Sequence, residues 1–152
     1  MIDKYMKLAI KEASKGINNN HGGPFGCVIV KDDVVVGKGH NMVIKKKDPT
    51  CHGEIMAIHQ ACKKLDSFDL SGCILYTTGE PCPMCMGAIL WANIDKVYYG
   101  CNILDTEKIG FRDKVFYDFS SNKKNEMLIE LDREACLKLY SKYSNLSNKT
   151  KY

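Results

Sequence analysis

The sequence predicts an α/β protein: a mostly parallel sheet covered by helices on both faces, with a hairpin that adds an antiparallel edge. Segments with the helical spacing of apolar residues alternate along the chain with short β-rich segments. The 152 residues, 45% of them hydrophobic and 26% charged, suit a single compact domain over 1–152. The sequence contains no internal repeat and no linker-like segment.

The first half of the chain predicts a helix, a hairpin and a second helix. Residues 2–17 place apolar side chains at helical spacing with lysines around the rest of the wheel, as in a helix packed on a sheet. A basic amphipathic helix could also lie on a membrane surface. Two β-rich runs, 25–30 and 34–43, flank a polar turn and predict a hairpin. After a lysine-rich loop at 45–49, residues 52–65 again have helical spacing.

The second half predicts three further strands, alternating with helices. Strands are expected at 73–78, 96–101 and 127–131. Helices are expected at 83–92, after a proline-containing turn, and at 132–143. The stretch between the last two strands is expected to be irregular. With the hairpin, the predicted sheet has five strands.

Composition bears on compartment and partners. Charged side chains between residues 3 and 12 interrupt any apolar core of a secretory signal, and no apolar run is long enough to span a bilayer. Eight cysteines in such a chain indicate a reduced, cytoplasmic protein more than a disulfide scaffold. Cys27, Cys62, Cys73 and Cys136 have core-facing spacing and are expected to be buried. The net charge of +4 permits nucleic-acid contact without requiring it.

Two predicted helix starts carry chemically distinctive residues: His-Gly-Glu at 52–54 and Pro-Cys-Pro-Met-Cys at 81–85. Functional sites of α/β sheets gather at the carboxyl ends of strands, where such helices begin. Cys82 and Cys85 are three residues apart, so both sulfurs can point the same way from the first helical turn. The helix dipole stabilises thiolates, and sulfur combined with the imidazole of His52 favours zinc.

Glu54 distinguishes a catalytic zinc site from a structural one. Catalytic zinc has three protein ligands and a fourth position for water, which the metal activates, whereas structural zinc has four protein ligands. Glu54 lies two positions from His52, close enough to exchange protons with such a water without becoming a ligand. Two alternatives stay open: Cys51 could be a fourth ligand of a structural site, and the Cys-x-x-Cys pair could be a redox motif.

His-x-Glu followed by Pro-Cys-x-x-Cys is a known signature of zinc deaminases, and the chain resembles the cytidine deaminase superfamily. Within it, the chain is similar to bacterial guanine deaminases over most of its length. The matching stretches are 22–26, 39–41, 48–50, 80–89, 91–92, 110–113 and 151–152. The resemblance implies a three-layer α/β/α sandwich with a central mixed five-stranded sheet, and hydrolysis of guanine to xanthine and ammonia. It also implies Zn2+ as cofactor, held by His52, Cys82 and Cys85, with Glu54 as the catalytic proton shuttle.

The same resemblance implies roles in substrate binding. Asn41 would hydrogen-bond the purine edge, Phe25 would help to form the pocket wall, and Asp113 would contact the base. Relatives of this type resemble homodimers in which the C-terminal segment, here 144–152, closes over the site of the partner subunit. Tyr152 would then be a lid residue.

Each of these roles has a simpler structural alternative. An asparagine after a strand, as at 41, is often a turn former, and Phe25 could be a core residue. Asp113 could cap the local turn at 111–114, and the terminal Tyr152 could be disordered.

Two other activities stay open. Residues 39–42 (Gly-His-Asn-Met) and 52–55 (His-Gly-Glu-Ile) are similar to fungal-type cytosine deaminases. A tRNA-specific adenosine deaminase would use the same zinc site, and the lysines at 45–47 could then contact phosphates, although a solvated loop is the simpler interpretation. Such editors usually lack the patterns at 22–26 and 110–111, so a nucleobase is favoured over nucleic acid as the partner.

None of these patterns assigns a chemical role to His40 or His59. Without a motif, a histidine is expected to be a structural or exposed residue.

Overall fold

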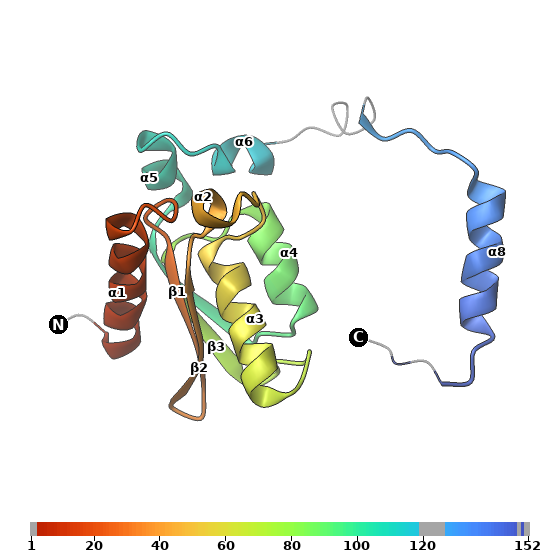
Figure 1. Ribbon diagram of the computed structural model, residues 1–152, viewed down its shortest axis with the longest axis horizontal. Helices are drawn as coiled ribbons and strands as arrows, with labels where there is room; N and C mark the ends of the chain where they lie inside the picture. Colours follow the sequence, from red (N-terminus) through yellow and green to blue (C-terminus); the bar gives the residue numbers. More distant parts are fainter. Residues whose placement is uncertain (1–2, 119–126, 149, 151–152) are drawn as a thin grey trace. The chain divides into compact units, whose positions relative to one another are not determined.

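The computed structural model describes residues 3–118, 127–148 and 150. The chain forms two compact units, residues 1–117 and 118–152. The first unit contains the sheet, and the second contains helix α8 (Arg133–Ser144), drawn in blue in Figure 1. None of the described helices is long and apolar enough to cross a membrane.

The first unit is built on a mixed sheet of four strands in the order β2-β1-β3-β4. Strands β1 (Gly26–Lys31) and β2 (Val34–His40) form the predicted antiparallel hairpin. Strand β3 (Cys73–Gly79) pairs antiparallel with β1 and parallel with β4 (Lys96–Cys101). Strand β1 is therefore an interior strand with an antiparallel neighbour on each side, so the prediction of a mostly parallel sheet is wrong. The hairpin does form an antiparallel edge of the sheet, as predicted. The helix-connected strands β2, β3 and β4 do share one direction, but β1 separates β2 from β3.

The predicted fifth strand at 127–131 is not formed, so the described sheet has four strands instead of five. These residues belong to the second unit, and Ile129 and Leu131 are 85% and 78% exposed. Apolar and β-branched side chains favour a strand only where a neighbouring strand supplies hydrogen bonds and a packing surface. The segment has no strand partner among the described residues.

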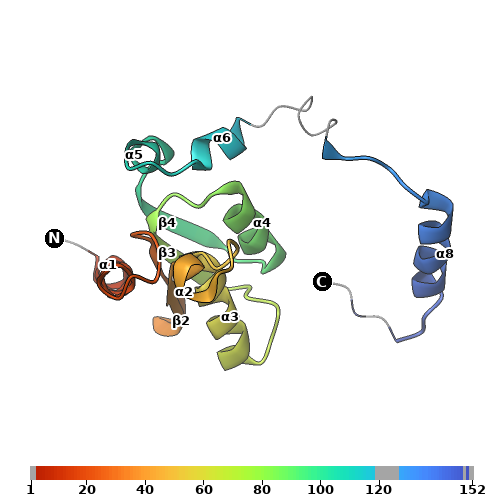
Figure 2. The same ribbon diagram turned by 45° about the horizontal axis from the view of Figure 1, so that its top comes forward.

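Helices cover both faces of the sheet, as predicted (Figures 1 and 2). Helix α1 (Lys4–Asn18) packs on one face against β1, β3 and β2, while α3 (Gly53–Leu65) packs on the other face, next to α4 (Pro83–Trp91). Alternate side chains of β1 pack against the helices on the two faces of the sheet, because successive residues of a strand point to opposite faces. Val28 and Val30 pack toward α1, whereas Cys27 and Ile29 pack toward α3.

Helix α1 begins after Asp3, whose side chain accepts hydrogen bonds from the backbone N–H groups of Tyr5 and Met6. Further along, α1 lies close to the first residue of β1. A Cβ atom at Gly26 would lie 2.1 Å from the carbonyl oxygen of Ala9, so only glycine fits there without moving the helix.

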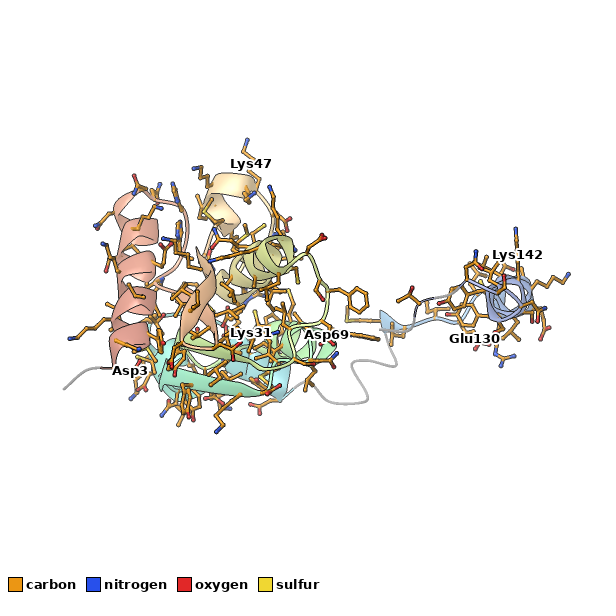
Figure 3. All side chains as sticks on the ribbon, turned by 90° about the horizontal axis from the view of Figure 1, so that it is seen from below. Asp3, Lys31, Lys47, Asp69, Glu130 and Lys142 are labelled. Atoms are coloured by element: carbon orange, nitrogen blue, oxygen red, sulfur yellow. The ribbon has the colours of Figure 1, made fainter. Side chains whose placement is uncertain are left out.

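Three short helices lie where the sequence predicts no helix. The first starts at Val43, the end of the predicted strand 34–43, so that strand is shorter than predicted and ends at His40. Helix α2 (Val43–Lys46) precedes Lys47, which is labelled in Figure 3, and α5 (Ile103–Lys108) and α6 (Asp113–Tyr117) follow β4. A capping box between Asn102 and Asp105 starts α5.

The expected burial of four cysteines is only partly confirmed. Cys27 and Cys73 are fully buried and Cys62 is half-buried, but Cys136 is exposed. Cys136 lies on α8, whose described residues include none that is buried.

The strand register brings the ends of β2, β3 and β4 to one end of the sheet. His40 pairs with Gly26, and Gly79 pairs with Cys101. Helices α3 and α4 begin at this end. Lys31 and Asp69, labelled in Figure 3, lie at the opposite end, where Lys31 pairs with the first residue of β3.

We predict that Leu75→Ala lowers the free energy of unfolding by about 2–5 kcal/mol, because Leu75 is fully buried in the interior strand β3. Leu104→Ala is the matched control: this leucine of α5 is 49% exposed, and its loss should cost less than about 1 kcal/mol. Urea denaturation followed by circular dichroism measures both. Equal losses for the two variants would contradict the core described above.

Candidate active site

The residues of the two sequence motifs stand at the starts of α3 and α4. His52 and Cys82 occupy the N-cap positions, both with extended backbone, and Pro83 follows at the first helical position of α4. Glu54 and Cys85 lie in the first turns of the two helices. A proline there costs no helical hydrogen bond, which explains why α4 can begin between the two cysteines.

His52, Cys82 and Cys85 have a geometry that fits zinc. The Nδ1 atom of His52 lies 3.6 Å from Sγ of Cys82 and 3.5 Å from Sγ of Cys85. Tetrahedral zinc with ordinary Zn–S and Zn–N bonds separates a sulfur from a nitrogen by about 3.6 Å. Among the residues that the structure describes, these three form the group of histidine, cysteine and carboxylate side chains able to share an ion.

The two thiols are coupled through one proton. The Cys85 thiol donates a hydrogen bond to Cys82, which lowers the pKa of Cys82 to about 4. Burial acts to raise this pKa, and the hydrogen bond with His52 lowers it further. The same hydrogen bond, followed by burial, raises the pKa of Cys85. The pKa of His52 is raised, first by its hydrogen bond with Cys82. This arrangement favours a thiolate at Cys82, and a cation bound by both sulfurs would replace the shared proton.

Glu54 is a buried carboxyl group next to this cluster, only 5% exposed. Its Oε2 atom lies 3.4 Å from Sγ of Cys85, and its Oε1 atom lies 3.4 Å from the hydroxyl of Thr77, which donates to it. Burial is the largest cause of its raised pKa, and the charge of Cys82 acts in the same direction. A carboxyl group with a raised pKa suits proton transfer near neutral pH.

A cavity of about 720 Å³ opens over these groups. Phe25 and Asn41 contribute to its wall, and their backbones are joined by a hydrogen bond of 2.8 Å from Asn41 N to Phe25 O. The Oδ1 atom of Asn41 accepts a 3.1 Å hydrogen bond from Val43 N at the start of α2. Phe25 meets Phe111 edge to face, with ring centroids 4.8 Å apart.

Asp113, the first residue of α6, also lines this cavity. Burial raises its pKa, as does the charge of Cys82. Two contacts tie the α5–α6 segment to the turn before α4: the Tyr117 hydroxyl donates a 2.5 Å hydrogen bond to Pro81 O, and Glu80 Oε2 accepts one of 2.8 Å from Ile103 N.

The structure thus brings together seven of the eight residues that the sequence analysis proposed for the site. Six of them line the cavity, and Cys85 lies next to Glu54 beneath it. Tyr152 lies outside the described residues. Cys51 is buried but does not belong to the metal-binding group, because its thiol faces Asp48.

Sequence reasoning missed other residues of this region, among them Thr77, Glu80, Met84 and Arg112. Alternation along β3 could have placed Thr77 on the face that carries Glu54, since every second residue of this strand is buried. Nothing in the sequence alone pointed to the pocket positions of Met84, Glu80 and Arg112, all of which line the cavity.

Comparison with known proteins identifies the family of this site. Residues 1–101 match the family model described as the cytidine and deoxycytidylate deaminase zinc-binding region. The chain is similar to guanine deaminase of Bacillus subtilis, with 39% identity over 99% of this chain and 98% of that protein. The X-ray structure of the Bacillus subtilis enzyme superposes with a TM-score of 0.86 at 36% identity, covering 99% of both chains.

Two further comparisons lie in the same group. A tRNA-specific adenosine deaminase of Aquifex aeolicus is 36% identical over 83% of this chain and 90% of that protein. A structure of guanine deaminase from Nitrosomonas europaea is 31% identical, with a TM-score of 0.68 over 72% of this chain and 63% of that chain. The chain therefore belongs to the cytidine and deoxycytidylate deaminase family of zinc-binding proteins.

Proposed function

We propose that this protein is a zinc-dependent hydrolase that converts guanine and water to xanthine and ammonia. The observation that carries this proposal is the full-length similarity to guanine deaminase of Bacillus subtilis. That similarity extends beyond the zinc-binding region of residues 1–101 and includes α6 and the two residues before it, which line one side of the pocket.

The pocket has the chemistry that a free nucleobase requires. Small-molecule sites combine apolar walls with a few convergent polar groups. Phe25, Phe111 and Ile44 provide apolar and aromatic wall for a flat ring, and Asn41 and Asp113 provide polar groups for its edge.

The proposed reaction depends on proton transfer by Glu54. Bound at His52, Cys82 and Cys85, zinc would supply Lewis-acid activation of a water. Glu54 accepts a proton from the attacking water and passes it to a ring nitrogen next to C2 of guanine. Glu54 then takes the remaining proton of that water from the oxygen now bonded to C2 and delivers it to the amino group. The C2–N bond breaks, ammonia leaves, and the C2–O bond becomes a carbonyl of xanthine.

Asn41 and Asp113 would orient the base. Because Oδ1 of Asn41 is engaged by Val43 N, the Nδ2 group is the part of this amide that can donate to an acceptor on the purine edge. The Asp113 carboxylate can accept from the N–H groups of guanine.

We also propose that the active form is a homodimer in which residues 144–152 of one chain close over the site of the partner subunit, with Tyr152 as lid residue. Apolar side chains in both units support association. Leu139 and Tyr140 on α8 are 64% and 69% exposed, and Leu90 on α4 is 68% exposed. Apolar surface of this kind is typical of residues that become covered in an assembly.

A cytoplasmic location is part of the proposal. All eight cysteines are free thiols, and Cys101 and Cys136 are exposed. Exposed thiols stay reduced in the cytoplasm, where disulfides are rare.

One observation favours a second candidate, tRNA adenosine deamination: relatives with that name are 32% to 36% identical to this chain. The same zinc centre would serve either substrate. The choice therefore depends on the pocket walls, and a direct comparison of substrates decides it.

We predict that zinc-loaded protein releases ammonia from guanine and not from adenine, guanosine or cytidine. An ammonia-coupled assay over these compounds and cytosine, with a tRNA anticodon stem-loop assayed separately for inosine, tests this. Preference for cytosine would favour a cytosine deaminase instead. Inosine formation without turnover of any free base would overturn the proposal in favour of tRNA editing.

We predict that Glu54→Gln lowers kcat for guanine by about 10²–10⁴-fold and leaves the zinc content unchanged, because glutamine keeps the shape of the side chain but cannot carry protons. Steady-state kinetics and metal analysis measure the two effects. Glu107→Gln, at an exposed position of α5, is the matched control and should keep full activity. A Glu54→Gln protein with near-normal kcat would exclude the proton-transfer role.

We predict that Asn41→Ala and Asp113→Asn lower kcat/KM for guanine by about 10-fold and 10–100-fold, the sizes typical of a neutral and a charged hydrogen bond. Zinc content and melting temperature, measured on the same samples, separate this effect from loss of structure. If the two variants are folded and contain zinc, and still bind and turn over guanine normally, then other groups bind the base.

A further inference from the structure

Three polar side chains behind the pocket form a hydrogen-bonded chain: Glu12 of α1, His40 at the end of β2, and His21 in the loop before β1. The Nδ1 atom of His40 lies 3.1 Å from Oε2 of Glu12, and its Nε2 atom lies 2.8 Å from Nδ1 of His21. The two imidazole rings also stack, with centroids 5.1 Å apart and planes inclined by 16°. The side chains of His40 and Glu12 are only 8% and 13% exposed.

The distances restrict the ways in which these groups can share hydrogens. The Glu12 carboxylate accepts the N–H of His40 Nδ1, which leaves Nε2 of His40 to share one hydrogen with Nδ1 of His21. Burial, followed by the charges of Lys45, His40 and Lys15, lowers the pKa of His21. A neutral His21 ring can take part in the 2.8 Å contact, whereas N–H groups on both facing atoms would break it.

The backbone of His21 joins this chain to two neighbouring helices. Its N–H group donates a 2.9 Å hydrogen bond to Gly16 O near the end of α1. Its carbonyl oxygen accepts hydrogen bonds of 3.0 and 3.1 Å from the N–H groups of Ile44 and Lys45 in α2. His21 therefore fixes the position of the α1–β1 loop relative to α2.

Both histidines are direct chain neighbours of pocket residues. Gly22 follows His21, and Asn41 follows His40. These two pocket residues touch each other so closely that a Cβ atom at Gly22 would lie 2.0 Å from Oδ1 of Asn41. Each imidazole ring therefore lies one residue away along the chain from a group of the pocket wall.

We propose that Glu12, His40 and His21 are positioning residues that hold Asn41 and Gly22 at the separation required to bind the substrate base. This inference rests on the proposed function, because it takes the pocket to be a nucleobase site. None of the three side chains lines the cavity, so their loss should weaken substrate binding and leave the chemical step at Glu54 intact. In kinetic terms, KM should rise while kcat stays constant.

The first test is His21→Phe, which keeps an aromatic ring for stacking but removes the hydrogen bond to His40. We expect KM for guanine to rise by about tenfold and kcat to change by less than about twofold. His59→Phe is the matched control, because His59 is an exposed histidine of α3, and it should leave both constants unchanged.

A second variant, Gly16→Ala, tests the position of the His40 ring without removing any hydrogen-bonding group. A Cβ atom at Gly16 would lie 2.7 Å from Cδ2 of His40, so the ring must move. Alanine is also a better helix former than glycine, which offsets destabilisation of α1. We expect KM to rise as in His21→Phe, with kcat and the zinc content unchanged. Because two different variants are tested, the positioning role can be judged even if one of them does not fold.

Wild-type protein assayed alongside separates the two levels of inference. If the wild-type protein deaminates guanine and the folded variants share its KM, or lose kcat instead, the positioning role is wrong and the proposed function stands. If the wild-type protein does not deaminate guanine, the proposed function fails and this inference fails with it. Non-additive effects in the double variant Glu12→Gln/His21→Phe would support action as one chain, and additive effects would oppose it.

Discussion

The common direction of β2, β3 and β4 brings both metal-binding helices to one end of the sheet. Helix α3 follows β2 and α4 follows β3, and the two strands are parallel although β1 lies between them. The N-termini of both helices therefore meet at the same end of the sheet. The N–H groups there carry a partial positive charge, which makes this the place in the fold where thiolates and a carboxylate can be buried together.

Burial makes this cluster unstable as a set of anions. Without a cation, Cys82 and Cys85 share a proton, and burial raises the pKa of Glu54. A bound divalent ion reverses this balance, because it favours the ionised form of every nearby acid. Metal binding at these side chains would therefore be linked to release of the thiol proton and to ionisation of Glu54.

Local sequence signals predicted the site better than the sheet. The starts of α3 and α4 could be placed within one residue, because helical spacing of apolar residues begins at 52 and because Pro83 favours the first helical position. The interior position of β1 depends on which strands meet in three dimensions, and no spacing within 26–31 encodes it. The segment at 127–131 has strand-like residues but no pairing partner, so its propensity was misleading. Helix α5 was missed although its capping pair, Asn102 and Asp105, was present in the sequence.

Because the zinc centre is shared across the family, substrate choice must come from the pocket walls. In this chain the α1–β1 loop and the segment before α6 meet across the pocket: Phe25 packs on Phe111, and a Cβ atom at Gly23 would lie 2.7 Å from Cζ of Phe111. Gly79 lets this wall close, since a Cβ atom there would already approach Phe25 to 3.2 Å. A flat base can enter beside such a wall. An apolar wall of this kind suits the face of a flat ring, which is the chemistry expected of a nucleobase pocket.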